Sequence, residues 1–157
     1  MDYLPNVKAG VAGIIGVVGG IAIGLLGGWD MALQTLLMLM VLDYGSGLLL
    51  AGVFHKSKKT ETGSLSSTVG WKGISKKVMT LVFVLVGAQI DKLMGIDTVR
   101  YGIIIAYIVI EGVSLVENAG LMGMPVPKIL LNAIDILKKN EDMVVPNPLS
   151  EIYEEIK

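Results

Sequence analysis

A lysine-rich segment, residues 55–77, lies between two long regions that are almost free of charge. It holds six lysines and one acidic residue. Each flanking region is long enough to cross a bilayer twice, because a spanning helix needs about 20 apolar residues. Basic loops between apolar hairpins are typical of membrane proteins, and their lysines place them in the cytoplasm. The chain is therefore predicted to be an all-α membrane protein with a basic cytoplasmic loop over 55–77.

The composition favours the same class. Of 157 residues, 53% are hydrophobic, and a soluble domain of this size exposes too much of its surface to hide that share. The chain has no cysteine, which excludes disulfides and Cys-ligated metals, and its single histidine, His55, gives no basis for a metal site. Neither a cofactor nor a nucleic-acid partner is expected, since the net charge is only -1.

The first predicted span covers residues 9–29 and is rich in glycine. Four glycines sit four residues apart and share one helix face: Gly16, Gly20, Gly24 and Gly28. Small residues at this spacing allow two helix backbones to approach closely in lipid. The glycine face is predicted either to pack against helices of the same chain or to join protomers, and the sequence leaves both readings open.

The second predicted span covers residues 31–54 and contains one charged residue, Asp43, near its middle. A carboxylate at that depth costs a few kcal/mol by insertion scales, so such residues usually face protein or water and have a function. The alternative is a packing residue that is protonated or hydrogen-bonded, for example to Tyr44 or Ser46.

The basic loop and the third span follow. The lysines are expected at the cytoplasmic surface or against anionic lipid headgroups: Lys56, Lys58, Lys59, Lys72, Lys76 and Lys77. Residues 66–77 have helical spacing and are predicted to start an interfacial helix, with a solvated loop as the alternative. The third span is placed at 75–95. Its apolar part, 78–90, is only about 20 Å long as a helix, so flanking lysines would have to extend it.

The fourth predicted span, 99–120, has a polar stripe along one face. Tyr107, Glu111, Ser114 and Asn118 are spaced four, three and four residues apart, and Glu117 lies beside them. Polar residues within a membrane turn toward a helix partner or toward water. The stripe is therefore predicted either to hold the bundle together through hydrogen bonds or to line a pore in an assembled state.

Residues 1–120 thus form a predicted transmembrane domain of about four helices, and residues 121–157 a second region. Two prolines, Pro125 and Pro127, end the fourth span. The apolar spacing over 128–140 predicts an amphipathic helix at the membrane surface, followed by an acidic tail. Four spans with a cytoplasmic central loop place both termini in the cytoplasm.

No sequence pattern indicates an enzyme. The chain lacks a phosphate-binding glycine loop before Lys-Ser/Thr, an HExxH pair and a nucleophile elbow. The carboxylates Asp43, Glu111 and Glu117 have no nucleophile or metal set in their sequence neighbourhood, so no catalytic residue is predicted.

Several residue groups between positions 31 and 140 together resemble one family. They are Asp43-Tyr44 with Gly47, Ser67-x-x-Gly70-Trp71-Lys72-Gly73-x-x-Lys76-Lys77, Asp91, Glu111-Gly112-x-Ser114-x-x-Glu117-Asn118, and Gly123-x-Pro125-x-Pro127-Lys128. The chain resembles the toxin-secretion/phage-lysis holin family, which includes clostridial toxin-export holins. Members often carry Asn directly before the first of these glutamates, where this chain has Ile110.

The resemblance implies a small protein of the bacterial cytoplasmic membrane that assembles with copies of itself and opens lesions. Such lesions release an endolysin or a protein toxin, which would be cargo rather than a bound partner. The alternative function is a small transporter or channel subunit in which Asp43 and Glu111 bind protons or cations. A weaker alternative is a membrane anchor for a partner that docks on the C-terminal region.

Overall fold

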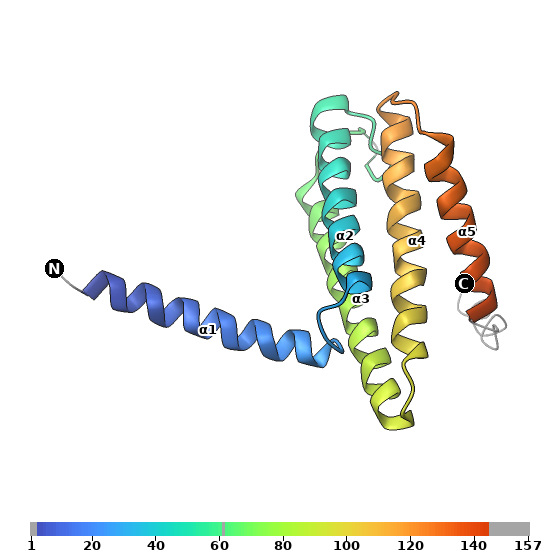
Figure 1. The fold of residues 1–157 in the computed structure, drawn as a ribbon. Helices are drawn as coiled ribbons and strands as arrows, with labels where there is room; N and C mark the ends of the chain where they lie inside the picture. Colours follow the sequence, from blue (N-terminus) through green and yellow to red (C-terminus); the bar gives the residue numbers. More distant parts are fainter. Residues whose placement is uncertain (1–2, 61, 145–157) are drawn as a thin grey trace.

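The computed structural model describes residues 3–60 and 62–144, and the expected acidic tail from residue 145 onward lies outside them. The described chain is helical and has no strand, which confirms the all-α class. The helices are α1 (Tyr3–Leu25), α2 (Met31–Leu49), a short π-helix η1 (Leu50–Phe54), α3 (Ser67–Met94), α4 (Thr98–Leu121) and α5 (Lys128–Val144). Helices α2, α3 and α4 form an up-down-up bundle, as Figure 1 shows.

Three helical segments of the described chain are long and apolar enough to cross a membrane: Met31–Phe54, Ser67–Met94 and Thr98–Leu121. The shortest have 24 residues, or about 36 Å, which exceeds the roughly 30 Å of a hydrocarbon core. The first predicted span, 9–29, corresponds to α1. The apolar helix found there, Ala12–Leu25, is shorter than the other three, and α1 projects sideways from the bundle (Figure 1).

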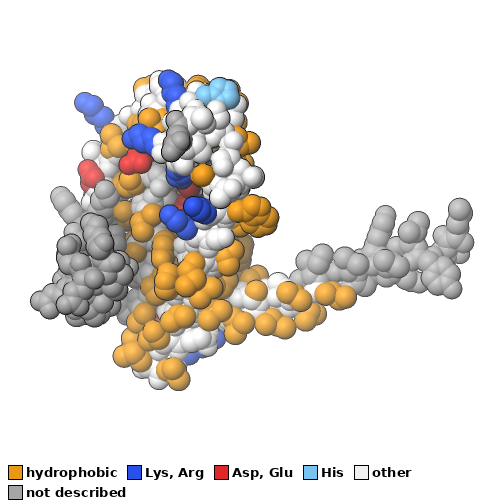
Figure 2. All heavy atoms as spheres, turned by 180° about the vertical axis from the view of Figure 1, so that it is seen from behind, with side chains coloured by type: hydrophobic (Ala, Val, Ile, Leu, Met, Phe, Trp, Pro, Cys, Tyr) orange, Lys and Arg blue, Asp and Glu red, His pale blue; other side chains and the backbone are white. Residues whose placement is uncertain are grey.

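The core of the bundle is small and lies toward its α1 end. Leu33, Leu36 and Met40 of α2 pack there with Val84 of α3 and Ile104 of α4. Many other large apolar side chains are exposed, as suits a surface that faces lipid rather than water. Figure 2 shows apolar side chains covering much of the bundle and α1, with charged side chains gathered toward the end that carries the 55–66 loop.

Helix α3 begins earlier than the third predicted span. It starts at Ser67 and runs for 28 residues without a break, so residues 67–77 belong to the helix and the connection between α2 and α3 covers only 55–66. The helix is therefore long enough to span, and the expected shortage of length does not arise. The helical spacing over 66–77 predicted a helix start there, and in the structure this segment continues without a break into the apolar part of α3.

One glycine allows α3 and α4 to cross closely. A methyl group on Gly87 would lie 3.1 Å from the Arg100 Cα atom and 2.7 Å from the Ile103 Cδ1 atom. Since only a hydrogen atom fits between the two backbones there, Gly87 sets the separation of the helices near this end.

The expected amphipathic helix over 128–140 is present as α5, which begins directly after Pro127. It lies along the outside of α4 and runs antiparallel to it (Figure 1). Ile134 of α5 is 7% exposed and packs against the face of α4 that contains Gly112. Its neighbours Leu130 and Leu131 remain exposed.

Candidate functional site

Three charged groups meet between α2, α3 and α4, and each helix supplies one of them. They are the carboxyl group of Asp43 on α2, the ammonium group of Lys77 on α3 and the carboxyl group of Glu111 on α4. The Lys77 Nζ atom lies 2.9 Å from Asp43 Oδ2 and 2.5 Å from Glu111 Oε2. The side chains are largely buried, with exposed fractions of 18% for Lys77, 10% for Asp43 and 8% for Glu111. We call Asp43, Lys77 and Glu111 the charged cluster.

The three residues lie at similar depth in the bundle. At about 1.5 Å per residue, Asp43 is about 18 Å from the start of α2, Lys77 about 15 Å from the start of α3, and Glu111 about 20 Å from the start of α4. Each position is near the middle of a membrane-spanning segment. Charges there are costly unless paired, so the ion pairs are what allows these residues to remain in a spanning bundle.

Two further polar side chains extend the charged cluster. The Asn118 amide donates to the Ser46 hydroxyl at 2.9 Å and to Asp43 Oδ1 at 3.3 Å. The Ser46 hydroxyl in turn donates to the backbone carbonyl of Asp43 at 2.9 Å. Throughout the described part of the chain, no fully buried side-chain nitrogen or oxygen lacks a hydrogen-bond partner.

The residues of the predicted polar stripe of α4 do not all face the same surroundings in the structure. Glu111 and Asn118 turn inward to α2 and α3, whereas Glu117 is exposed. Tyr107 stacks on Phe83 of α3, with ring centroids 6.3 Å apart. Ser114 is half-buried. The glutamate and the amide therefore contact neighbouring helices, which is the arrangement expected of a stripe that holds the bundle together.

Lys77 is the residue that the sequence analysis placed differently. It was expected at the cytoplasmic surface or against lipid headgroups, but its ammonium group points into the bundle. The other lysines of that group are exposed: Lys56, Lys58, Lys59, Lys72 and Lys76. Helical spacing separates Lys76 and Lys77 by about 100°, so consecutive lysines face solvent and core respectively.

Little of the described chain lies against the glycine face of α1, although the Gly24 carbonyl accepts a hydrogen bond from Lys92 of α3 at 3.3 Å. Around Gly16, Gly20 and Gly24, no atom lies within 4 Å of the position that a side-chain methyl group would occupy. Gly28 belongs to the turn after α1, where its carbonyl accepts a hydrogen bond from Arg100 at 3.2 Å. Of the two roles that the sequence left open, close packing of Gly16, Gly20 and Gly24 against helices of the same chain is therefore not seen in the described part of one protomer.

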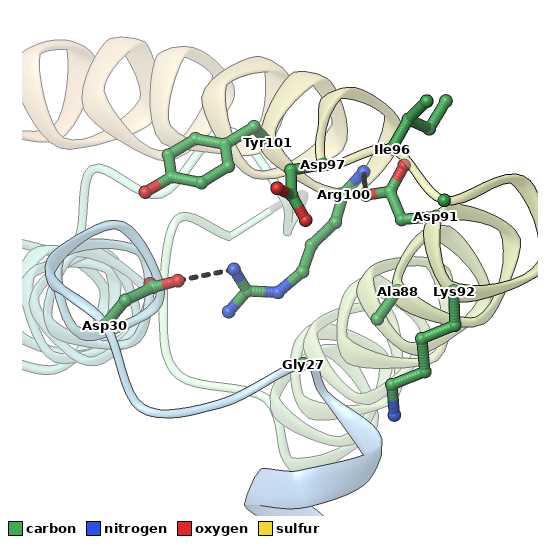
Figure 3. A pocket seen from close by; sticks show the side chains of 10 residues that line it. Gly27, Asp30, Ala88, Asp91, Lys92, Ile96, Asp97, Arg100 and Tyr101 are labelled. Carbon is green, nitrogen blue, oxygen red and sulfur yellow. Dashed lines mark hydrogen bonds and ion pairs between the residues drawn. The ribbon is translucent and has the colours of Figure 1, made fainter.

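A second charged group lies at the opposite end of the bundle, where α1, α2 and α4 meet. The Arg100 guanidinium of α4 forms an ion pair with Asp30, at 2.5 Å between Nη1 and Oδ2. It also donates to the backbone carbonyls of Leu26 and Gly28. Figure 3 shows Arg100 extended from α4 toward Asp30, with the turn at Gly27 passing beside it. Arg100 thus ties the α1–α2 turn to the start of α4.

Asp91, at the end of α3, completes this end of the bundle. Its carboxylate accepts hydrogen bonds from the backbone N–H groups of Val99 and Arg100, each at 2.9 Å. These are unpaired donors of the first turn of α4, and a negative charge is favourable at a helix N-terminus. A cavity of about 380 Å³ lies beside these residues and is lined in part by Asp91, Lys92 and Arg100 (Figure 3).

The environment of Asp30 favours its ionised form. Partial burial opposes ionisation, but the hydrogen bonds from Arg100 and from the backbone N–H of Leu33, with the positive charge of Arg100, hold the pKa of Asp30 below its ordinary value. The same carboxylate caps the N-terminus of α2, since Leu33 N lies 2.8 Å from Asp30 Oδ1.

These features define a helical membrane protein whose spanning helices are joined by buried ion pairs. Comparison with known proteins assigns the family. The bacteriophage holin family model matches residues 20–139, and the chain belongs to that family. The match covers α2, α3 and α4 completely and therefore includes both charged groups.

The similar proteins come from Gram-positive bacteria and their phages. An uncharacterised protein of Halalkalibacterium halodurans is 44% identical over 123 residues, which cover 74% of this chain and 85% of that protein. An uncharacterised protein of Listeria monocytogenes is 40% identical over 83% of this chain and 89% of its own length. A probable holin of Bacillus phage phi105 is 26% identical over 70% of this chain and 76% of its own length. No solved structure matches the chain.

Proposed function

We propose that this protein is a holin that assembles with copies of itself in the bacterial cytoplasmic membrane and opens lesions there. The lesions release an endolysin or a protein toxin. The observation that carries the proposal is the family match over residues 20–139, and the similarity to a probable phage holin supports it. A family of holins also gives no reason to expect an enzymatic activity.

Two features of the fold support self-assembly. A side chain added at Gly16, Gly20 or Gly24 of α1 would meet open space, so this face is available to a second copy. The charged cluster is satisfied within one protomer by Asp43, Lys77 and Glu111. A protomer with internally paired charges can accumulate in the membrane without harm. Separation of α2, α3 and α4 would then expose the same polar groups to water in an open assembly.

The orientation that we propose has the 55–66 loop in the cytoplasm, because its lysines favour that side. The Asp30, Asp91 and Arg100 end of the bundle then faces outward. Both termini are cytoplasmic if α1 crosses the membrane as a fourth span. Since the chain has no cysteine, a single cysteine at Ser64 or at Ile96 can be labelled selectively from either side. Labelling of Ser64→Cys by an impermeant reagent added outside intact cells would show that the 55–66 loop lies outside and would contradict the proposed orientation.

The test of function is induced expression in bacteria, with membrane potential and release of a cytoplasmic enzyme followed together. A holin produces a sudden loss of potential followed by release of protein-sized cargo. Proteoliposomes loaded with a fluorescent ion indicator and a labelled protein separate this from the transporter alternative. Flux of ions without release of the labelled protein would support a transporter or channel and contradict the holin.

A further inference from the structure

The charged cluster contains one more carboxyl group than ammonium groups. Lys77 is shared by Asp43 and Glu111, so full ionisation of all three would leave a net charge of -1 between the helices. Other charged side chains on the surrounding helices do not balance it. Lys76 of α3 and Glu117 of α4 are exposed.

The remaining neighbours do not supply a positive charge either. The phenols of Tyr44 on α2 and Tyr107 on α4 carry no positive charge in either protonation state. On α5, which packs against α4, Asp135 is exposed and would add negative charge. Within the described residues, Lys77 is therefore the sole cation that faces the two carboxyl groups.

The two carboxyl groups are also close to each other. Each places an oxygen atom within 3 Å of the same ammonium nitrogen, Nζ of Lys77. Two carboxylates that share a site oppose each other's ionisation, and adjacent pairs in proteins commonly hold one proton between them. Burial in a spanning bundle strengthens this effect, because an unbalanced charge is poorly solvated there.

We propose that Asp43 and Glu111 hold one shared proton at neutral pH, which makes the charged cluster a proton-binding site with no net charge. The proton forms an O–H···O hydrogen bond between the two carboxyl groups, and Lys77 pairs with the one remaining negative charge. That charge lies mainly on Asp43, because Asn118 also donates to Asp43 Oδ1, at 3.3 Å. Glu111 consequently carries the proton for most of the time.

Infrared spectroscopy of the purified full chain tests this directly. The protein is held at pH 7 in a detergent without ester groups, whose carbonyl bands would overlap the signal. The expected spectrum contains the C=O stretch of a protonated carboxyl group, which surface carboxylates do not give at this pH because they are ionised. The band should disappear as the pH is raised, in a single-proton step.

Variants identify the groups that hold the proton. Asp43→Asn and Glu111→Gln should each abolish the band, because the remaining carboxylate then pairs one-to-one with Lys77. Lys77→Met should retain it or increase it up to twofold, and the exposed control Asp135→Asn should leave it unchanged. A band that survives in either Asp43→Asn or Glu111→Gln would contradict the proposal that the two carboxyl groups share one proton.

The wild-type spectrum keeps the test decisive if a variant does not fold. Absence of a protonated-carboxyl band at pH 7 in the wild-type protein would overturn the proposal by itself. None of these measurements depends on lysis, so the proposal of a proton site and the proposal of holin function can each be contradicted without affecting the other.

Discussion

Arg100 and Asp30 lie 70 positions apart in the chain and form an ion pair between the start of α4 and the cap of α2. The Arg100 side chain is 7% exposed, whereas that of Asp30 is 32% exposed. The buried guanidinium thus depends on a carboxylate that is itself partly in contact with solvent. The stability of this end of the bundle should therefore respond to pH.

Replacement of Asp30 by Asn should remove this response while it retains the helix cap, since Asn is as good an N-cap as Asp. The folded-state pKa of Asp30 is below the unfolded-state value of about 3.9. Its stabilising contribution is therefore complete above that value and is lost as the pH falls through the lower folded-state pKa. Thermal unfolding in detergent, followed by circular dichroism, should show wild type and Asp30→Asn converging in stability as the pH falls below the ordinary carboxyl range. A difference between them that stays constant down to pH 2 would contradict the assignment.

Replacement of Gly87 by Ala should destabilise the bundle by about 1–3 kcal/mol, the usual range for overpacking. The added methyl group would meet the backbone of Arg100 at 3.1 Å, and the backbone cannot move aside as a side-chain end can. Gly45 of α2 is the matched control, because a methyl group there has no atom within 4 Å. Denaturant titration in mixed micelles should show a loss for Gly87→Ala and none for Gly45→Ala. Equal effects at the two positions would mean that close crossing of α3 and α4 is not what Gly87 provides.

Replacement of Lys77 by Met should cost about 3–5 kcal/mol, the range measured when one partner of a buried ion pair is removed. The loss would be smaller if both carboxyl groups took up protons, so the effect should be greater at pH 8 than at pH 5. Lys76→Met is the control, since Lys76 is adjacent in sequence but exposed. The measurement is thermal unfolding of each purified variant at both pH values. A Lys77→Met protein as stable as Lys76→Met would show that the ion pairs contribute nothing to the fold.

Replacement of Gly20 by Leu should delay or abolish lysis without changing the stability of the isolated protomer. Apart from the backbone of α1 itself, no atom of the described residues lies within 4 Å of a methyl group at Gly20, so a larger side chain has room there until a second copy arrives. Val18→Leu, on an exposed part of the same helix, should lyse cells at the normal time. Lysis time after induction and cross-linked oligomers in membranes are both measured. Normal lysis by Gly20→Leu would exclude the glycine face as a protomer interface.

Replacement of Glu111 by Gln should also delay or abolish lysis. Glutamine keeps a hydrogen-bonding group beside Lys77 but cannot ionise. Separation of the helices would then expose a neutral amide to water instead of a carboxylate, and the hydration of the exposed group would favour the open state less. The variant should accumulate in the membrane to the wild-type level, which an immunoblot of membrane fractions checks. Lysis at unchanged timing would mean that the ionisation of Glu111 plays no part in opening.

Patterns along a single helix predicted more of this structure than contacts between helices. The spacing of Glu111 and Asn118 on α4 indicates that they share a face, and in the structure Glu111 contacts Lys77 of α3 while Asn118 contacts Asp43 of α2. The same spacing does not say which residue of another helix they meet. Lys77 was missed for this reason, although a buried carboxylate such as Asp43 requires a cation at similar depth.

The start of α3 shows a second limit of sequence patterns. Helix ends are usually read from a change in polarity, and the lysines before residue 78 look like the end of a loop. In the structure the helix continues through them, because Lys77 finds partners inside the bundle and the exposed lysines face outward. A charge within an apolar helix therefore marks its end only when no neighbouring helix can neutralise it.

The separation of the charged cluster over three helices has a consequence for biosynthesis. Asp43 leaves the ribosome 34 residues before Lys77, and Lys77 leaves it 34 residues before Glu111. A newly made α2 thus carries an unneutralised carboxylate until α3 follows. We expect the translocon to release these two helices into lipid together, as a hairpin, and to admit α4 afterwards.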